Sequence, residues 1–176
     1  MKKLLFLLIT TSLFSFSKSA FSQEEKVPLI TLNTGSFLYH FVPKSNDDYT
    51  QFFNNRYLSI GVKITKKGYF SFGTMLNSHG DRIATIGFKT NLYTFSEKIH
   101  LQGFYAYSGE FFFKAFSNAG NRGNYLAFKK RTGIGFIPVI YHGIDIKLNS
   151  FLAIEVGITL WVIPFASLRW DLFPVK

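Results

Sequence analysis

Residues 69–92 read YFSFGTMLNSHGDRIATIGFKTNL. In residues 69–76 and again in residues 83–92, large apolar side chains alternate with small or polar ones, and a repeat of two residues indicates a β-strand. The polar segment 77–82 between them predicts a turn, so the whole stretch predicts a β-hairpin. One bulky apolar face opposite one small or polar face is typical of a hairpin that crosses a membrane.

The N-terminal residues have the pattern of a secretory signal peptide. Two lysines precede an apolar run over residues 4–16, and the small residues Ala20 and Ser22 occupy the positions expected before a cleavage site. We therefore expect residues 1–22 to be removed on export and residues 23–176 to form one domain. A transmembrane anchor is the weaker alternative, because the apolar run is shorter than a spanning helix requires.

Composition narrows the class of protein further. The chain has no cysteine, which excludes a disulfide framework, and 22 of its 176 residues are phenylalanine. After the signal, no stretch stays apolar for the roughly 18 residues that a spanning helix needs. We therefore expect an all-β, transmembrane antiparallel barrel, the other fold that satisfies its backbone in lipid. The net charge of +10 is spread over strand ends and loops, so we expect lipid phosphates and no nucleic acid as partners.

The alternation of side chains predicts eight strands of roughly ten residues, the length that a tilted strand needs to cross a bilayer. Their expected ranges are 29–41, 56–65, 69–76, 83–92, 99–108, 132–145, 151–160 and 164–173. The connections at 43–55, 77–82 and 109–131 are the longer ones and should share one rim, which in outer-membrane barrels faces the cell exterior. The expected inward charges are Lys89, Glu155, Arg169 and Asp171, which can pair inside a narrow barrel.

A histidine and a serine fall at the same predicted rim. His40 ends the first strand and Ser78 follows the third, so two strand spacings of about 4.8 Å separate them. A histidine base beside a serine hydroxyl can support acyl transfer, although the spacing alone also fits two surface polar residues. The remaining histidines, His79, His100 and His142, lack the spacing of metal ligands, so we expect neither a metal nor a cofactor.

Six short segments carry a resemblance to a known family. They are Tyr39-His40, Phe53-Asn54-Asn55-Arg56, Leu76-Asn77-Ser78, Ile83-Ala84-Thr85-Ile86-Gly87, Ile137-Pro138 and Phe165-Ala166-Ser167-Leu168-Arg169. In this order and spacing they resemble the outer-membrane lipid A palmitoyltransferase family, which has Trp-His, Tyr-Asn-Glu-Arg, Lys-Asp-Ser, Ile-Ala-Gly-Tyr-Gly, Ile-Pro and Phe-Ala-Trp-Met-Arg. The resemblance implies an eight-stranded outer-membrane barrel, monomeric, that moves an acyl chain from a phospholipid donor to lipid A.

The resemblance also implies roles for individual residues. They are His40, Asn77 and Ser78 as catalytic positions, Gly87, Asn54 and Arg56 as substrate-binding positions, and Pro138 and Pro164 as sites of lateral lipid access. The parity of the strand independently points Gly87 inward, where a missing side chain would leave room for the end of an acyl chain. Proline cannot donate a ladder hydrogen bond, which would loosen strand pairing for lipid entry.

The chain departs from the family pattern at residue 77, which is Asn where the family has Asp. An amide neither accepts a proton nor carries negative charge at neutral pH, so Asp81, Asp47 or Asp48 would have to substitute. Two other interpretations stay open at this point. One is a non-catalytic outer-membrane barrel that uses loops 43–55 and 109–131 for adhesion, surface exclusion or a structural role. The other is a soluble, lipocalin-like periplasmic barrel with its apolar faces inward.

Overall fold

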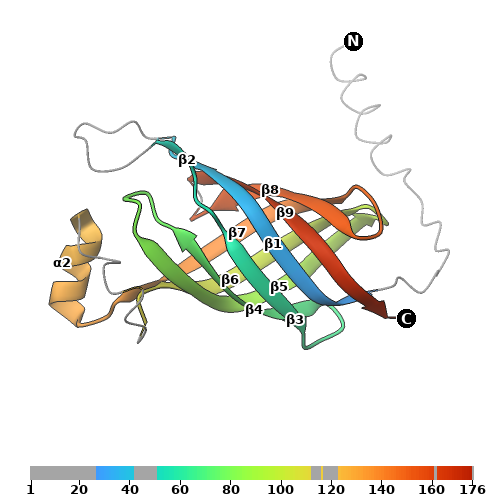
Figure 1. Ribbon diagram of the computed structural model, residues 1–176, viewed down its shortest axis with the longest axis horizontal. Coiled ribbons are helices and arrows are strands. Elements are labelled where there is room, and N and C mark those ends of the chain that lie inside the picture. Colours follow the sequence, from blue (N-terminus) through green and yellow to red (C-terminus); the bar gives the residue numbers. More distant parts are fainter. Residues whose placement is uncertain (1–26, 42–50, 112–115, 117–122, 161, 176) are drawn as a thin grey trace, which may run out of the picture.

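A computed structural model describes residues 27–41, 51–111, 116, 123–160 and 162–175. The expected signal peptide, and with it Asp47 and Asp48, lies outside these residues. In chain order the elements are β1 (Val27–Tyr39), β2 (Phe52–Asn54), β3 (Leu58–Lys63), β4 (Gly68–Leu76), β5 (Arg82–Ser96), β6 (Ile99–Gly109), α2 (Gly123–Thr132), β7 (Phe136–Lys147), β8 (Leu152–Thr159) and β9 (Ile163–Val175), as Figure 1 shows. Among the described residues, no helix is long and apolar enough to cross a membrane.

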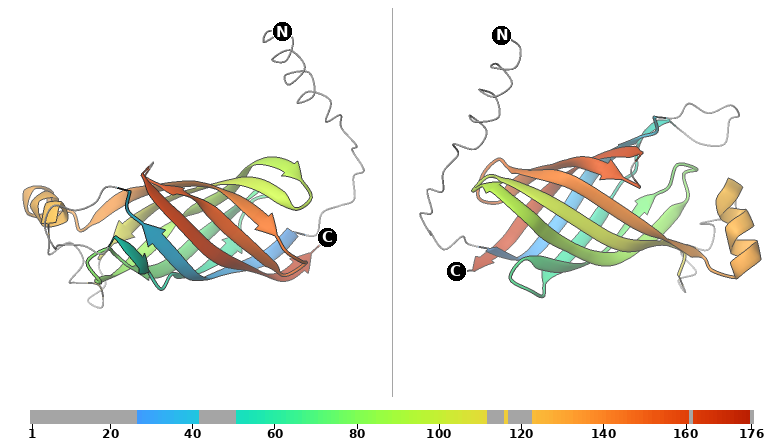
Figure 2. Two further views of the ribbon diagram at one scale, coloured as in Figure 1. Left: turned by 90° about the horizontal axis from the view of Figure 1, so that it is seen from above. Right: turned by 180° about the vertical axis from the view of Figure 1, so that it is seen from behind.

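The sheet closes on itself. β1 pairs with β3 on one side and with β9 on the other, and every neighbouring pair from β3 to β9 is antiparallel. Eight of the described strands thus form the barrel wall seen in Figure 2, which confirms the predicted eight-stranded antiparallel barrel. The short strand β2 lies outside this count, because it pairs only with the last residues of β1, from Phe37 to Tyr39.

The two rims differ. β2, residues 77–81 and α2 lie at one end of the barrel, here named the loop rim, and the C-terminal end of β9 lies at the other, the turn rim (Figure 1). The turn rim carries the short connections that follow β3, β5 and β7. The predicted segregation of long and short connections is therefore confirmed for the part of the chain that the structure describes.

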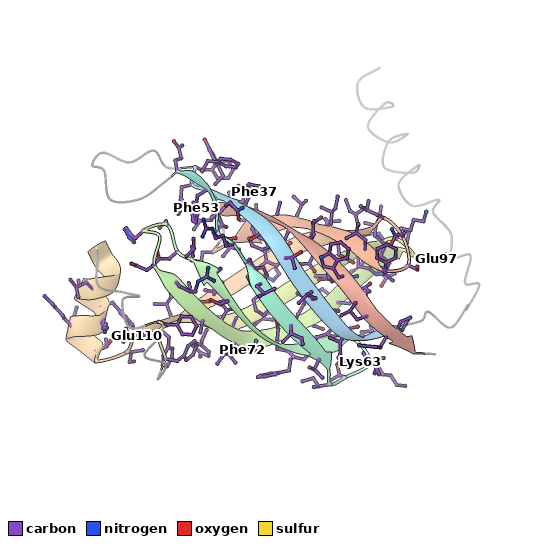
Figure 3. The ribbon with its side chains drawn as sticks, in the orientation of Figure 1. Phe37, Phe53, Lys63, Phe72, Glu97 and Glu110 are labelled. Atoms are coloured by element: carbon purple, nitrogen blue, oxygen red, sulfur yellow. The ribbon has the colours of Figure 1, made fainter. Side chains whose placement is uncertain are left out.

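Bulky apolar side chains cover the outside of the wall. In β3, Leu58, Ile60 and Val62 are exposed while Ser59 and Gly61 are buried. β4 repeats the pattern, and its Phe72 is 42% exposed and points away from the barrel (Figure 3). Small and polar residues inside with large apolar residues outside is the arrangement of a barrel in lipid. The soluble lipocalin-like alternative requires the reverse and is wrong.

A β-bulge changes the parity of β1. Gly35 has a φ of 51°, and the pairing of β1 with β9 shifts register between Thr34 and Ser36. Before the bulge Asn33 is buried, and after it Ser36 is buried, three residues on. An extra residue of this kind moves all later side chains to the opposite face. It explains why the alternation of residues 29–41 is unclear in the sequence, and it puts His40 on the inward parity.

Three predictions differ most from the structure, by four residues or more. Residues 123–132 form helix α2 where a loop was expected, because good helix formers such as Leu126, Ala127 and Lys129 follow one another there. The helix ends at Thr132, and the next residue, Gly133, makes a left-handed cap with a φ of 72° and an N–H that donates to the carbonyl of Lys129. β7 accordingly begins at Phe136 and not at residue 132, and β5 continues to Ser96 and not to residue 92.

A layer of charged side chains fills the part of the barrel interior nearer the turn rim. Lys89 Nζ lies 2.7 Å from Glu155 Oε1, and the amide of Asn33 donates to Glu155 over 2.8 Å. Arg169 pairs with Asp145 at 2.9 Å and with Asp171 at 2.7 Å. The predicted inward positions of Lys89, Glu155, Arg169 and Asp171 are confirmed, because all four side chains are buried. We call these residues, together with Asn33, Asp145 and Ser167, the ionic layer.

Candidate functional site

An apolar cavity of about 220 Å³ opens at the loop rim. Apolar residues of the barrel wall make most of its lining, and segment 77–81 closes one side. The described residues that line it are Leu38, His40, Phe53, Met75, Leu76, Asn77, Ser78, His79, Asp81, Ile83, Ser108, Ile137, Val139, Thr159, Leu160 and Ile163. The cavity therefore brings together His40 and Ser78, which lie 38 positions apart in the sequence.

His40 directly follows β1. Its backbone N–H donates to the carbonyl of Gln51 over 2.8 Å, and its ring stacks on that of Phe53 with centroids 6.3 Å apart. Burial lowers the pKa of His40 below its ordinary value of 6.5, and the nearby charge of His79 lowers it further. The imidazole is consequently neutral, and able to accept a proton, at neutral pH.

Asn77 builds the turn that carries Ser78. Its side-chain oxygen accepts hydrogen bonds from the backbone N–H of His79 over 3.0 Å and of Asp81 over 2.9 Å. Its own N–H donates to the carbonyl of Asp81 over 2.8 Å, and Gly80 completes the turn with a φ of 81°. Asn favours such turns because its side chain can bond to the backbone two residues on. The contacts of the Asn77 side-chain oxygen thus shape the segment that lines the cavity.

The two other rim positions that the resemblance singles out point away from the cavity. Asn54 and Arg56 are exposed, and the side-chain oxygen of Asn54 accepts the N–H of Arg56 over 2.9 Å. Neither lines the cavity. The residue between them, Asn55, is fully buried: its side-chain oxygen contacts the hydroxyl of Ser36 and its carbonyl accepts the N–H of Leu76 over 2.6 Å. Sequence reasoning passed over Asn55, which joins β1 to β4 beside the cavity.

Gly87 does not leave open space. It lies on the inward parity of β5, but it lines neither apolar cavity. A Cβ built there would lie 2.4 Å from the carbonyl oxygen of Tyr105 and 2.5 Å from the Cβ of Ala106. The missing side chain therefore serves the close approach of β5 and β6, and the expectation of a free space beside Gly87 is wrong, because β6 occupies that space.

Aromatic rings form the floor of the apolar region instead. A second, smaller cavity of about 50 Å³ shares Leu38, Met75, Val139 and Thr159 with the rim cavity and reaches down to Lys89 and Glu155. The ring of Phe165 packs edge-on against Tyr57 and Tyr141, with centroids 5.7 and 5.4 Å away, and Phe104 is buried beside them. We call these four residues the aromatic floor. The alternation of side chains alone could not identify the aromatic floor, because it predicts which residues face inward and not how they fill the interior.

The two prolines have different surroundings. The described pairing of β7 with β8 begins only at Tyr141 and Thr159, although β7 pairs with β6 from Phe136 onward. Pro138 therefore lies in a stretch whose β8 side is unpaired among the described strands, next to cavity-lining Ile137 and Val139. Pro164, by contrast, is paired with Ile158 within the β8–β9 ladder. The unpaired stretch of β7 thus contains Pro138, whereas Pro164 lies within a paired ladder.

Comparison with known proteins bears on the fold. No protein-family model matches the chain, and no curated protein matches it. A solved structure described as "De novo design of transmembrane beta-barrels" is similar, with a TM-score of 0.55 and 10% sequence identity, over 84% of this chain and 99% of that one. The chain is a transmembrane β-barrel. At this identity the similarity concerns the fold alone, and a membrane barrel is consistent with an outer-membrane location.

Within the described residues, no cluster of three or more His, Cys, Asp or Glu side chains could hold a metal ion.

Proposed function

We propose that this barrel transfers a fatty acyl chain from a phospholipid to lipid A, or to a related acceptor lipid, in the outer leaflet of the outer membrane. The observation that carries the proposal is the shared lining of one apolar cavity by a neutral histidine, His40, and a serine, Ser78. In this proposal the loop rim faces the cell exterior, as long connections do in outer-membrane barrels.

The proposed reaction uses Ser78 as nucleophile and His40 as base. His40 takes the hydroxyl proton as Ser78 Oγ attacks the acyl carbonyl of the phospholipid. An acyl ester forms on Ser78, the bond to the glycerol oxygen breaks, and that oxygen leaves with the proton as a lysophospholipid. The acceptor hydroxyl then attacks the ester while His40 takes its proton and returns it to Ser78. Acyl chain and protons balance over the two steps.

The surroundings of the pair favour a lipid as the substrate. The rim cavity is lined mainly by apolar side chains and continues to the aromatic floor, so an acyl chain could pack against apolar side chains over most of its length. The unpaired side of β7 around Pro138 supports a lateral entrance, because a proline there has no N–H to contribute to a ladder. A donor lipid could then enter from the membrane without leaving the bilayer.

The direct test is mass spectrometry of lipid A from cells that express the protein, with heat-modifiable migration on gels to show that the barrel is folded. We expect lipid A with one additional acyl chain. Folded barrel in the membrane together with unmodified lipid A would refute the enzyme.

The rate of acyl transfer should depend on pH through His40. Because its pKa lies below 6.5, activity should rise with pH, with a midpoint below pH 6.5. The positive charge of His79 contributes to this lowering, so His79→Gln should move the midpoint of the profile upward. The measurement is the rate against pH in detergent micelles for both proteins, and a midpoint that stays in place or falls contradicts the assigned coupling.

The aromatic floor should limit the length of the acyl chain. Phe165→Ala removes the ring that packs on Tyr57 and Tyr141, and the variant should transfer chains several carbons longer than the wild-type protein prefers. Competition between donors of different chain length, read by mass spectrometry of the product, measures this. Phe72→Ala on the lipid-facing side is the matched control and should leave the preference unchanged. An unaltered preference in Phe165→Ala would place the end of the chain elsewhere.

A non-catalytic barrel that binds a partner at its surface is the second candidate, and helix α2 favours it. Lys129 Nζ pairs with Glu110 at 2.7 Å, which ties the helix to the end of β6, while Lys130 and Arg131 are exposed. A cationic helix held at the loop rim could bind an anionic surface without any chemistry. Variants of His40 and Ser78 separate the two candidates, because only the enzyme needs them.

A further inference from the structure

A polar cavity of about 290 Å³ lies at the turn rim, at the opposite end of the barrel from the candidate site. Its lining includes Lys66 and Lys67, which belong to the connection between β3 and β4, and Lys147 at the end of β7. It extends to Asp145 and Arg169 of the ionic layer. Among the described residues, none lines both this cavity and the rim cavity, so acyl transfer does not use it.

The wall of this cavity has hydrogen-bond acceptors that lack donors. Gln102 is 8% exposed and Asp145 is fully buried. Three oxygen atoms of the lining, Gln102 Oε1, Asp145 Oδ1 and Asn91 Oδ1, are buried and make no hydrogen bond with any described residue. A buried acceptor without a donor is costly. A ligand that carries several N–H groups would therefore be stabilised here.

The strand register brings the three acceptors together. Asn91 is paired with Gln102 across the β5–β6 ladder, so their Cβ atoms lie about 4.5–5.5 Å apart. Gln102 is paired with Gly143 across the β6–β7 ladder, which makes Asp145 its diagonal neighbour, about 7–8 Å away. The amide nitrogen of Asn91 donates to Thr94 Oγ1 over 3.0 Å, which leaves the amide oxygen as the free acceptor. One small donor group can reach all three oxygen atoms.

The charge of the ionic layer favours a cation as this donor. The layer holds three carboxylates, of Asp145, Glu155 and Asp171, and two cations, of Lys89 and Arg169. The guanidinium of Arg169 is engaged by two of the acids, because its Nε lies 2.7 Å from Asp171 and its Nη1 lies 2.9 Å from Asp145 Oδ2. One formal negative charge is left over beside the cavity. An ammonium group, with a positive charge and three N–H donors, fits this end.

The lysines of the lining require the rest of the ligand to be anionic. Lys66 and Lys67 are exposed. The backbone N–H of Asn91 donates to the carbonyl of Lys67 over 2.9 Å, which holds this turn beside the acceptors. A cluster of lysines repels a simple cation and attracts an anionic group. A molecule that suits both parts of the cavity has an ammonium group and an anionic group.

We propose that the turn-rim cavity binds a small zwitterion, with its ammonium group at Asp145, Gln102 and Asn91 and its carboxylate or phosphate group at Lys66 and Lys67. Amino acids and ethanolamine phosphate share this chemistry. In outer-membrane barrels the rim with short turns faces the periplasm, so the ligand would enter from that side. The proposal stands apart from acyl transfer, which takes place at the other rim.

The test titrates the folded barrel with four probes in a nonionic detergent, because a zwitterionic detergent would compete. β-Alanine and O-phosphoethanolamine carry both charges, ethanolamine carries the ammonium alone, and inorganic phosphate carries the anion alone. Calorimetry measures affinity, and the NMR signal of the Gln102 side-chain amide reports on the site. At least one zwitterion should bind and shift this signal, about tenfold or more tightly than ethanolamine or phosphate. The tighter zwitterion identifies the anionic group.

Variants of each part of the cavity test the assigned contacts. Gln102→Met removes an acceptor at similar length and should weaken binding of the zwitterion by about tenfold. K66Q/K67Q should reduce the affinity for the zwitterion to that for ethanolamine. Lys98→Gln removes an exposed lysine of the turn rim that does not line the cavity, and it should bind as wild type does. Heat-modifiable migration shows that the variants fold.

Four results would overturn the proposal. Ethanolamine that binds as tightly as both zwitterions would remove the anionic group, and inorganic phosphate that does so would remove the ammonium. Unchanged binding in K66Q/K67Q or in Gln102→Met would place the ligand outside this cavity. The last is the absence of binding by either zwitterion. None of them bears on acyl transfer, so the two proposals fail separately.

Discussion

Replacing His40 with alanine is expected to lower the rate of acyl transfer by about 10²- to 10⁴-fold, the usual contribution of a general base. Ser78→Ala should have an effect of the same size, because without the hydroxyl no acyl ester can form on the protein. The double variant should be little worse than either single one, since the two groups act as a unit. The measurement is kcat and KM with a phospholipid donor and lipid A in mixed micelles.

Two controls match the chemistry of these substitutions. Ser108 also lines the rim cavity, but its hydroxyl is 2.9 Å from that of Thr85, so Ser108→Ala should remain active. His142 lies on the wall, where its Nε2 is 3.1 Å from the hydroxyl of Tyr105, so His142→Ala should remain active too. Heat-modifiable migration would show that all variants fold. A fully active His40→Ala or Ser78→Ala would contradict the proposed roles.

Most of the fold follows from parity. Lipid demands apolar side chains on one face of each strand, and a narrow lumen demands small or polar ones on the other. Residues 58–63 satisfy both rules without exception, and their burial is as expected. Inward charges such as Lys89 and Glu155 are predictable for the same reason, because a charge facing lipid would be costly.

Parity is insufficient where the ladder is interrupted or where partners come from several strands. The bulge at Gly35 inverts the rule within β1, and its signal, one glycine, is too weak to locate it. Asp145 completes the ionic layer and Phe165 the aromatic floor, yet both depend on which strands face each other across the lumen. The space expected beside Gly87 fails for a related reason: its partner strand β6 lies against it, with Ala106 directly opposite.

Removing one member of the ionic layer is expected to destabilise the barrel by about 3–5 kcal/mol. Glu155 is 2% exposed. Its carboxylate accepts hydrogen bonds from Lys89 over 2.7 and 3.0 Å and from Asn33 over 2.8 Å, and Arg169 lies 3.9 Å away. Glu155→Ala would leave the ammonium of Lys89 buried and uncompensated. The free energy of unfolding by urea in lipid vesicles measures the loss, and Glu110→Ala, which breaks the more exposed pair with Lys129, should cost about 0–1 kcal/mol.

The double variant K89M/E155M decides whether the layer acts through its charges or through its packing. Two apolar side chains of similar volume remove the buried ammonium and its counter-charge together, so the double variant should recover most of the stability that Glu155→Ala loses. The recovery should be incomplete, because Asn33 and Arg169 would each lose a partner. A double variant as unstable as the single one would show that the shape of the layer matters more than its charge.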